Sequence, residues 1–182
     1  MTPVHDLAVL QQALDQLAEL LNGLDRAALS DRTPCEEWTV QDLVDHVVAA
    51  PENFARMLRR EPIDWSASPS AGEHPTEIFR AHAADLLAAW HDVDDPAQPV
   101  SLDWQCAELA VHTWDLATAL RVPTDGFDPE VAERGLAFMR ASLTHDRRGP
   151  AFGPERQAPE EADSYQRIAA FAGRSVNLTP LP

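Results

Sequence analysis

The sequence contains no lysine, so all 14 of its fixed positive charges are arginines. This absence excludes enzymes that form a Schiff base on a lysine and nucleotide-binding proteins that hold phosphate with a P-loop lysine. The seven glycines nowhere form G-x-G-x-x-G, so the dinucleotide-binding fingerprint is missing as well. No serine lies in a G-x-S-x-G segment, which excludes the nucleophile elbow of the α/β-hydrolases.

Cysteines and long apolar runs are also scarce. Cys35 and Cys106 form neither a C-x-x-C motif nor a disulfide framework, which excludes zinc ribbons and thioredoxin chemistry and is typical of a reducing cytoplasm. No apolar run approaches the roughly 18–20 residues of a membrane span, and the N-terminal MTPVHDLAVL lacks the features of a secretory signal. We therefore expect a cytoplasmic protein with no membrane partner.

Acidic residues outnumber basic ones, 30 to 14, and the formal net charge is −16 at pH 7. Polyanions repel such a chain, so no nucleic-acid partner is expected. Hydrophobic residues make up 45% of the 182 positions. That composition supports a folded core, and the length fits a single domain over residues 1–182.

Apolar spacing predicts helices along most of the chain. Leucines stand alternately three and four residues apart between Leu7 and Leu24, which predicts an amphipathic helix there. Thr39 and Asp42 have the spacing of a capping box for a helix that begins near Val40. Pro51 should kink that helix or end it.

Further helices are predicted over about 76–92, 103–121 and 163–173, and one more begins at Pro129 with Asp128 as its cap. Six residues of the first of these are expected to face inward: Ile78, Phe79, Ala83, Leu86, Leu87 and Trp90. No convincing strand is found. The expected fold class is all-α, a bundle of four main helices with extra C-terminal helices.

The segment AELAVHTWDLA places two polar side chains in an apolar helical run. Glu108 and His112 are four residues apart, so they share one helical face. Carboxylate and neutral imidazole are ligands of zinc and related divalent ions. Glu108 could instead simply hydrogen-bond His112, and two ligands from one helix do not complete a metal site.

His46 is the candidate for a third ligand. It lies in the middle of a predicted helix among Val44, Val47 and Val48. Facing helices of a bundle project ligands into the core, and three protein ligands plus a water form an open site of the catalytic type. Asp42, four residues before His46, could pair with it instead.

The remaining candidates are weaker. Cys35 precedes the His46 helix, and its thiol is either reactive or structural. Trp38 and Trp114 are expected in the core or in a pocket wall. Asp115 is expected to anchor a helix, to pair with an arginine or to bind a ligand histidine. The other histidines show no spacing that favours a joint site: His5, His74, His82, His91 and His145.

Three segments together resemble a known family. TPCEEWTVQDLVDHVV is similar to the N-terminal signature of the DinB/YfiT-like bundles, specifically the metal-binding N-terminal family of mycothiol-dependent maleylpyruvate isomerases. ELAVHTWDLATAL resembles the second signature of that family. YQRIAAFAGRS resembles the closing segment of its single-domain actinobacterial branch. The resemblance covers roughly residues 5–175.

The resemblance implies a DinB/YfiT-like four-helix bundle that holds one divalent metal ion on His46, Glu108 and His112. Zinc is the expected ion, with nickel and iron as alternatives. It also implies a transferase or isomerase in which the metal activates a low-molecular-weight thiol such as mycothiol toward a small electrophilic substrate. No protein side chain is assigned as catalytic, because a metal-bound thiol or water would serve as the nucleophile.

The sequence departs from the family in three places. The segment HDVDDPAQPVSLDW looks short, Pro51 stands where relatives carry ordinary helix residues, and the chain is too short for the additional C-terminal domain of the full isomerase. Isomerase activity on maleylpyruvate is therefore not expected to carry over. Two other functions stay open: a metal-dependent hydrolase that uses the bound water, and a non-catalytic bundle with a structural or interaction role, for example as a homodimer.

Overall fold

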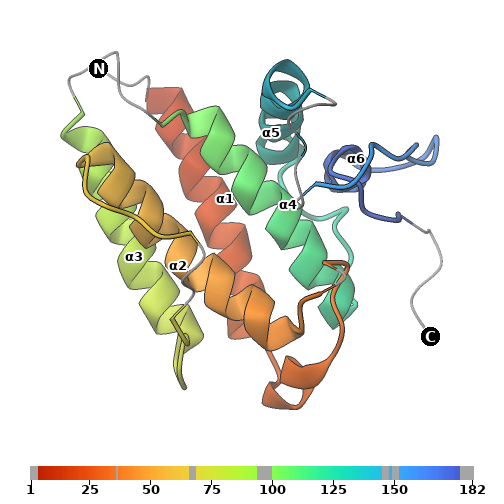
Figure 1. The fold of residues 1–182 in the computed structure, drawn as a ribbon, viewed down its shortest axis with the longest axis horizontal. Coiled ribbons are helices and arrows are strands. Elements are labelled where there is room, and N and C mark those ends of the chain that lie inside the picture. The colour runs from red at the N-terminus through yellow and green to blue at the C-terminus, as the bar shows by residue number, and fades with distance from the viewer. Residues whose placement is uncertain are drawn as a thin grey trace.

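Helices account for nearly all regular structure in a computed structural model that describes residues 4–35, 37–65, 69–93, 100–144, 148 and 152–176 (Figure 1). Within these ranges a single isolated bridge, between Arg32 and Thr39, is the only β-type pairing. The elements in chain order are α1 (Val4–Asn22), η1 (Arg26–Ser30), α2 (Val40–Leu58), α3 (Pro75–His91), α4 (Leu102–Leu120), α5 (Pro129–Ser142) and α6 (Ser164–Phe171). The predicted all-α class is confirmed.

The first four α-helices form the bundle. α1 packs against α3 and α4, and α2 packs against the same two helices. α5 and α6 then cover the outer side of α4, as the right-hand half of Figure 1 shows. Because α4 has neighbours on several sides, most of its residues are buried, from Leu102 to Ala117. A helix surrounded in this way needs an apolar surface all round, and any polar side chain on it needs a partner.

The helix α2 begins as the sequence predicts. The Thr39 hydroxyl accepts a hydrogen bond from the Asp42 backbone N–H, and the Asp42 carboxylate accepts one from the Thr39 backbone N–H, which completes a capping box. Pro51 was predicted to kink the helix or to end it. The second of these predictions is wrong, because α2 continues to Leu58. Beyond the proline, Phe54 and Ala55 are fully buried, and this packing holds the last turns in helical form.

The helix α3 gives a second correction. Ile78 was expected to face inward, but it is 37% exposed. Phe79, Ala83, Leu86 and Trp90 are buried on one face. Ile78 directly precedes Phe79 and therefore lies about 100° away from that face around the helix.

The last two helices also begin at their predicted caps. Asp128 accepts a hydrogen bond from the Glu130 backbone N–H, with Pro129 as the first residue of α5. Asp163 and Gln166 form a second capping box at the start of α6. In the described parts of the chain, no helix is both long enough and apolar enough to cross a membrane.

Candidate metal centre

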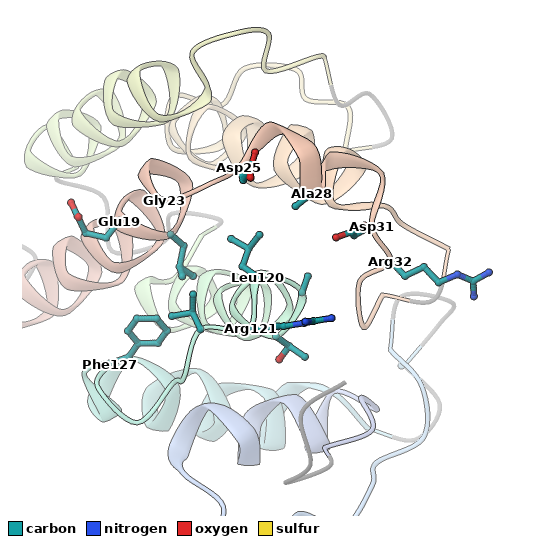
Figure 2. A pocket seen from close by; sticks show the side chains of 13 residues that line it. Glu19, Gly23, Asp25, Ala28, Asp31, Arg32, Leu120, Arg121 and Phe127 are labelled. Atoms are coloured by element: carbon teal, nitrogen blue, oxygen red, sulfur yellow. The ribbon is translucent and has the colours of Figure 1, made fainter. Parts of the chain in front are cut away.

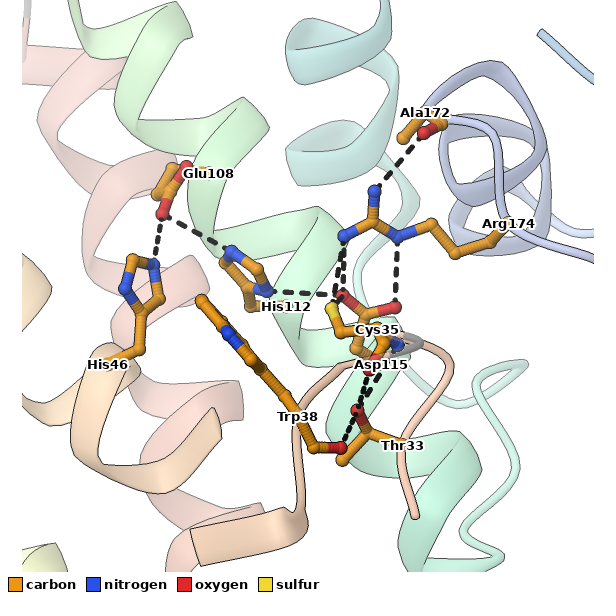
Figure 3. A network of polar contacts seen from close by, with 9 residues as sticks. All are labelled: Thr33, Cys35, Trp38, His46, Glu108, His112, Asp115, Ala172 and Arg174. Carbon is orange, nitrogen blue, oxygen red and sulfur yellow. Dashed lines mark hydrogen bonds and ion pairs between the residues drawn. The ribbon is translucent and has the colours of Figure 1, made fainter. Parts of the chain in front are cut away.

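Facing positions of α2 and α4 bring the three predicted ligands together (Figure 3). The Nε2 atom of His46 lies 2.8 Å from Oε1 of Glu108, and Nε2 of His112 lies 3.3 Å from the same oxygen. The candidate ligand atoms of the three residues are all within 4.8 Å of one another. The three residues predicted from the sequence therefore lie next to one another in the structure.

The three side chains are nearly buried, with exposed fractions of 13% for His46, 18% for Glu108 and 11% for His112. They keep enough exposure to meet a small molecule from solvent. Ligand atoms about 2.0–2.2 Å from a tetrahedral zinc ion lie roughly 3.4 Å apart. The His112–Glu108 separation is close to that value, and the His46–Glu108 contact is a shorter hydrogen bond.

The sequence left two alternatives to metal binding, an Asp42–His46 pair and a Glu108–His112 hydrogen bond. Asp42 does not pair with His46, because its Oδ2 atom accepts hydrogen bonds from the backbone and hydroxyl of Thr39. The Glu108–His112 contact does exist, yet Glu108 approaches His46 more closely than it approaches His112. Metal binding by His46, Glu108 and His112 stays a prediction.

Asp115 holds the other nitrogen of His112. Its Oδ2 lies 3.1 Å from His112 Nδ1, and its side chain is fully buried. Asp115 also forms an ion pair with Arg174, which confirms its predicted pairing with an arginine. A carboxylate that accepts from Nδ1–H leaves the lone pair of Nε2 free to bind a metal ion. This arrangement therefore suits metal ligation.

The metal-free cluster has strongly shifted pKa values. Burial disfavours the charged form of Glu108, but the charge of His112 and hydrogen bonds from His112 and His46 outweigh it and lower the pKa of Glu108. Burial likewise acts against the charge of His112. The charge of Glu108 and hydrogen bonds to Asp115, Cys35 and Glu108 outweigh it and raise the pKa of His112 well above its usual value.

A tight turn before α2 places Cys35 and Trp38 at the site. The Thr33 hydroxyl accepts from the Cys35 backbone N–H at 3.1 Å and donates to the Trp38 carbonyl at 2.9 Å. The half-buried thiol of Cys35 then donates to Asp115 Oδ2 at 3.1 Å, and the Arg174 guanidinium donates to its sulfur at 3.2 Å. Cys35 therefore supports the carboxylate that orients His112.

Aromatic rings line one side of the cluster. The Trp38 ring centre lies 4.8 Å from that of His46 and 5.9 Å from that of His112. Trp65 is a further neighbour of His46, at 6.5 Å between ring centres, and it continues into Phe54 and Trp104. The prediction of Trp38 in a pocket wall is in keeping with this position, whereas Trp65 was not anticipated, because it follows α2 in an irregular segment.

Arg174 is the other residue that the sequence did not single out. It is one of 14 arginines and lies two residues after the C-cap of α6, so its sequence position does not indicate burial. Its only signal is membership of the closing segment YQRIAAFAGRS.

The remaining candidates lie apart from the cluster. His82 Nδ1 hydrogen-bonds the Val48 carbonyl at 2.8 Å. Cys106 is fully buried, and this burial raises the pKa of its thiol to about 12. His145 and the side chain of His5 fall outside the described residues.

A cavity of about 840 Å³ lies elsewhere, where the ends of α1 and α4 meet η1 (Figure 2). Leu20, Leu120 and Phe127 contribute its apolar lining, and Asp31, Arg32 and Arg121 are among its polar residues. None of the three predicted ligands lines this cavity. It is therefore separate from the candidate metal centre.

The comparisons with known proteins identify the family. Residues 10–117 match the family described as the mycothiol maleylpyruvate isomerase N-terminal domain, and this span is more than half of the chain. The chain belongs to that family. The match to the mycothiol maleylpyruvate isomerase N-terminal domain family includes His46, Glu108, His112 and Asp115, but ends before Arg174.

Two curated proteins are similar to the chain beyond the matched domain. They are uncharacterized proteins of Mycobacterium tuberculosis, one from strain CDC 1551 and one from strain H37Rv. Each is 34% identical over 185 aligned positions, which cover 91% of this chain and 96% of the relative. No solved structure gives a significant match.

Proposed function

We propose that this protein binds a divalent metal ion through His46, Glu108 and His112 and uses it in thiol-dependent chemistry on a small electrophilic molecule. A low-molecular-weight thiol such as mycothiol is the proposed co-substrate. The observation that carries the proposal is the convergence of two imidazole Nε2 atoms on Glu108 Oε1 while Asp115 holds His112 through Nδ1.

The donor set fits a metal ion of borderline hardness. Two imidazoles and one carboxylate suit zinc, and they also accept nickel or iron. Three protein ligands leave a coordination position for an exogenous group. When bound, the ion would supply Lewis acidity that lowers the pKa of a coordinated thiol or water.

The chain's own residues would bind and orient the reactants. Asp115 keeps the Nδ1–H of His112 engaged, so that Nε2 stays available. Trp38 covers one side of both histidines and limits the access of water there. The exposed fractions of 11–18% keep the side chains of His46, Glu108 and His112 in partial contact with solvent.

Metal content tests the proposal directly. Untagged protein should contain close to one equivalent of metal by inductively coupled plasma mass spectrometry, and His46→Ala and His112→Ala should lose most of it. His82→Ala is the matched control, because His82 also lies on a bundle helix but contacts the Val48 carbonyl instead of the cluster. The proposal would be contradicted if purified wild type contained no metal and its melting temperature changed neither with chelator nor with added metal.

Thiol dependence separates the two enzymatic alternatives. With a panel of small electrophiles, turnover that requires both metal and added thiol supports the transferase or isomerase. Turnover that requires metal alone would favour a hydrolase in which water is the nucleophile.

A further inference from the structure

We propose that Arg174 is a positioning residue of the metal centre: its guanidinium fixes the carboxylate of Asp115, which in turn orients the imidazole of His112. This inference rests on the proposed metal-binding function. It assigns a role in the site to a residue that lies outside the family match over residues 10–117.

The contact between Arg174 and Asp115 fixes both carboxylate oxygens. Arg174 Nε donates to Oδ1 at 3.2 Å, and Nη2 donates to Oδ2 at 3.0 Å. Asp115 is fully buried and Arg174 is 8% exposed. A two-point contact of this kind holds the plane of the carboxylate as well as its position.

The Asp115 oxygen that accepts the hydrogen bond from Arg174 Nη2 is the same oxygen that contacts His112. Asp115 Oδ2 lies 3.1 Å from His112 Nδ1, and the Cys35 thiol also donates to it. If the carboxylate turned, the Nδ1 contact would be lost, and the His112 ring would be held by Glu108 and by its neighbour Trp38. The shared oxygen couples the contact with Arg174 to the contact with His112.

The chain after α6 is shaped to deliver Arg174 to this place. Gly173 has a positive φ of 94°, and a Cβ atom on it would lie 2.7 Å from the Gly153 Cα. Backbone and side chain of Arg174 donate to the carbonyls of Ala169 and Ala172, at 3.0 and 3.1 Å. Arg156 donates to the Gly173 carbonyl at 2.8 Å. Only a glycine permits this crossing of two backbone segments.

Lysine would be a poor substitute for Arg174. An ammonium group is a compact charge that cannot reach both carboxylate oxygens in fixed geometry as the planar guanidinium does. Replacement by lysine therefore tests geometry while it keeps the charge. Replacement by alanine removes both and leaves space for a free guanidinium ion.

Cobalt(II) titration followed by visible absorption provides the first readout. Arg174→Ala and Arg174→Lys should bind cobalt(II) about 10- to 100-fold more weakly than wild type, which is the usual effect of losing a partner behind a metal ligand. Millimolar guanidinium chloride should restore much of the affinity of Arg174→Ala but not that of Arg174→Lys. Arg167→Ala, an exposed arginine on α6, is the matched control and should bind as wild type does.

A metal-free readout keeps this inference separate from the proposed function. In proton NMR of metal-free wild type, the Nδ1–H of His112 should give a signal protected from exchange, because it is bonded to Asp115. That signal should disappear in Arg174→Ala and return with guanidinium, provided circular dichroism shows a folded variant. If Arg174→Ala does not fold, the Nδ1–H signal of Arg174→Lys is compared with that of wild type instead.

Wild-type cobalt affinity together with a retained Nδ1–H signal in both Arg174 variants would overturn the inference. A wild type that binds no cobalt would instead refute the proposed function. In that case the Nδ1–H signal alone still decides whether Arg174 positions His112.

Discussion

At the scale of single residues, the central feature is that one carboxylate oxygen faces two histidines. Glu108 Oε1 lies 2.8 Å from Nε2 of His46 and 3.3 Å from Nε2 of His112. Without a metal ion, this arrangement favours a protonated imidazole beside an ionised carboxylate. A metal ion that binds at the proposed centre would therefore have to displace a proton from His112, and its affinity should fall as the pH is lowered.

Glu108→Gln tests this electrostatic pairing in the metal-free protein. The amide has almost the same shape but no charge, so the pKa of His112 should fall, because the charge of Glu108 that raises it is lost. The measurement is an NMR titration of the His112 ring. Glu52→Gln is the control, because Glu52 forms its ion pair with Arg56, in the part of α2 that follows His46. An unchanged His112 pKa in Glu108→Gln would contradict the pairing.

The same shift sets the direction of a stability effect. Because the pKa of His112 is higher in the folded than in the unfolded chain, its pairing stabilises the metal-free fold fully below about pH 6.5. The contribution is lost as the pH rises through the raised, folded value. Glu108→Gln should reduce this loss.

The sequence was sufficient to single out the three clustered side chains and Asp115, and insufficient to single out Arg174. Glu108 and His112 share a helical face by spacing alone. His46 follows from its place in the middle of a facing helix, and the family signatures contain all three residues. Arg174 is 59 residues from Asp115, and no local pattern marks which of 14 arginines enters the core. Contacts of this kind depend on the tertiary path of the chain after α6.

At the scale of elements, α4 and α5 approach each other closely at Gly135. A Cβ atom there would lie 2.7 Å from the Ala107 Cα and 2.9 Å from its nitrogen. These are backbone atoms, which cannot move aside as a flexible side chain can. Ala107 directly precedes Glu108, so this contact also locates the part of α4 that carries the candidate ligand.

Gly135→Ala should therefore lower the stability of the protein. A better helix former contributes about 1 kcal/mol, but overpacking against backbone costs about 1–3 kcal/mol, so we expect a net loss of up to about 2 kcal/mol. Urea denaturation gives the free energy of unfolding. Gly126→Ala, where an added Cβ meets no heavy atom within 4 Å, should change little. A Gly135→Ala protein more stable than wild type would refute the close approach.

Helix ends were easier to predict than helix interruptions. The caps at Thr39 and Asp128 depend on neighbouring residues only, and both are confirmed. The effect of Pro51 depends on what lies beyond it, because the buried side chain of Phe54 keeps α2 together after the missing backbone hydrogen bond. The exposure of Ile78 depends likewise on how α3 is rotated against its neighbours.

At the scale of the whole molecule, the charge is strongly unbalanced. The net value of −16 leaves many acidic groups without a basic partner, and their mutual repulsion opposes the compact state. Some carboxylates do have partners, among them Asp85 with Arg59 and Asp103 with Arg134. Such pairs are too few to balance the total.

Salt should therefore stabilise the protein at pH 7. Raising sodium chloride from about 10 mM to 150 mM shortens the Debye length from about 30 to 8 Å and screens the repulsion. If this is worth about 1 kcal/mol, the melting temperature should rise by about 2–4 °C. Near the isoelectric point of about 4.6 the same salt step should give no increase. Calorimetry on metal-free protein at both pH values provides the comparison, and equal responses would contradict this account.

The late position of Arg174 in the chain has a consequence for biosynthesis. Arg174 leaves the ribosome 59 residues after Asp115, which corresponds to about 3–12 s at about 5–20 residues per second. During that interval His46, Glu108 and His112 already exist, while the guanidinium that fixes their support does not. A nascent chain therefore carries the three candidate ligands before it carries Arg174, and a metal ion at the proposed centre would meet the complete set of contacts only after synthesis of α6.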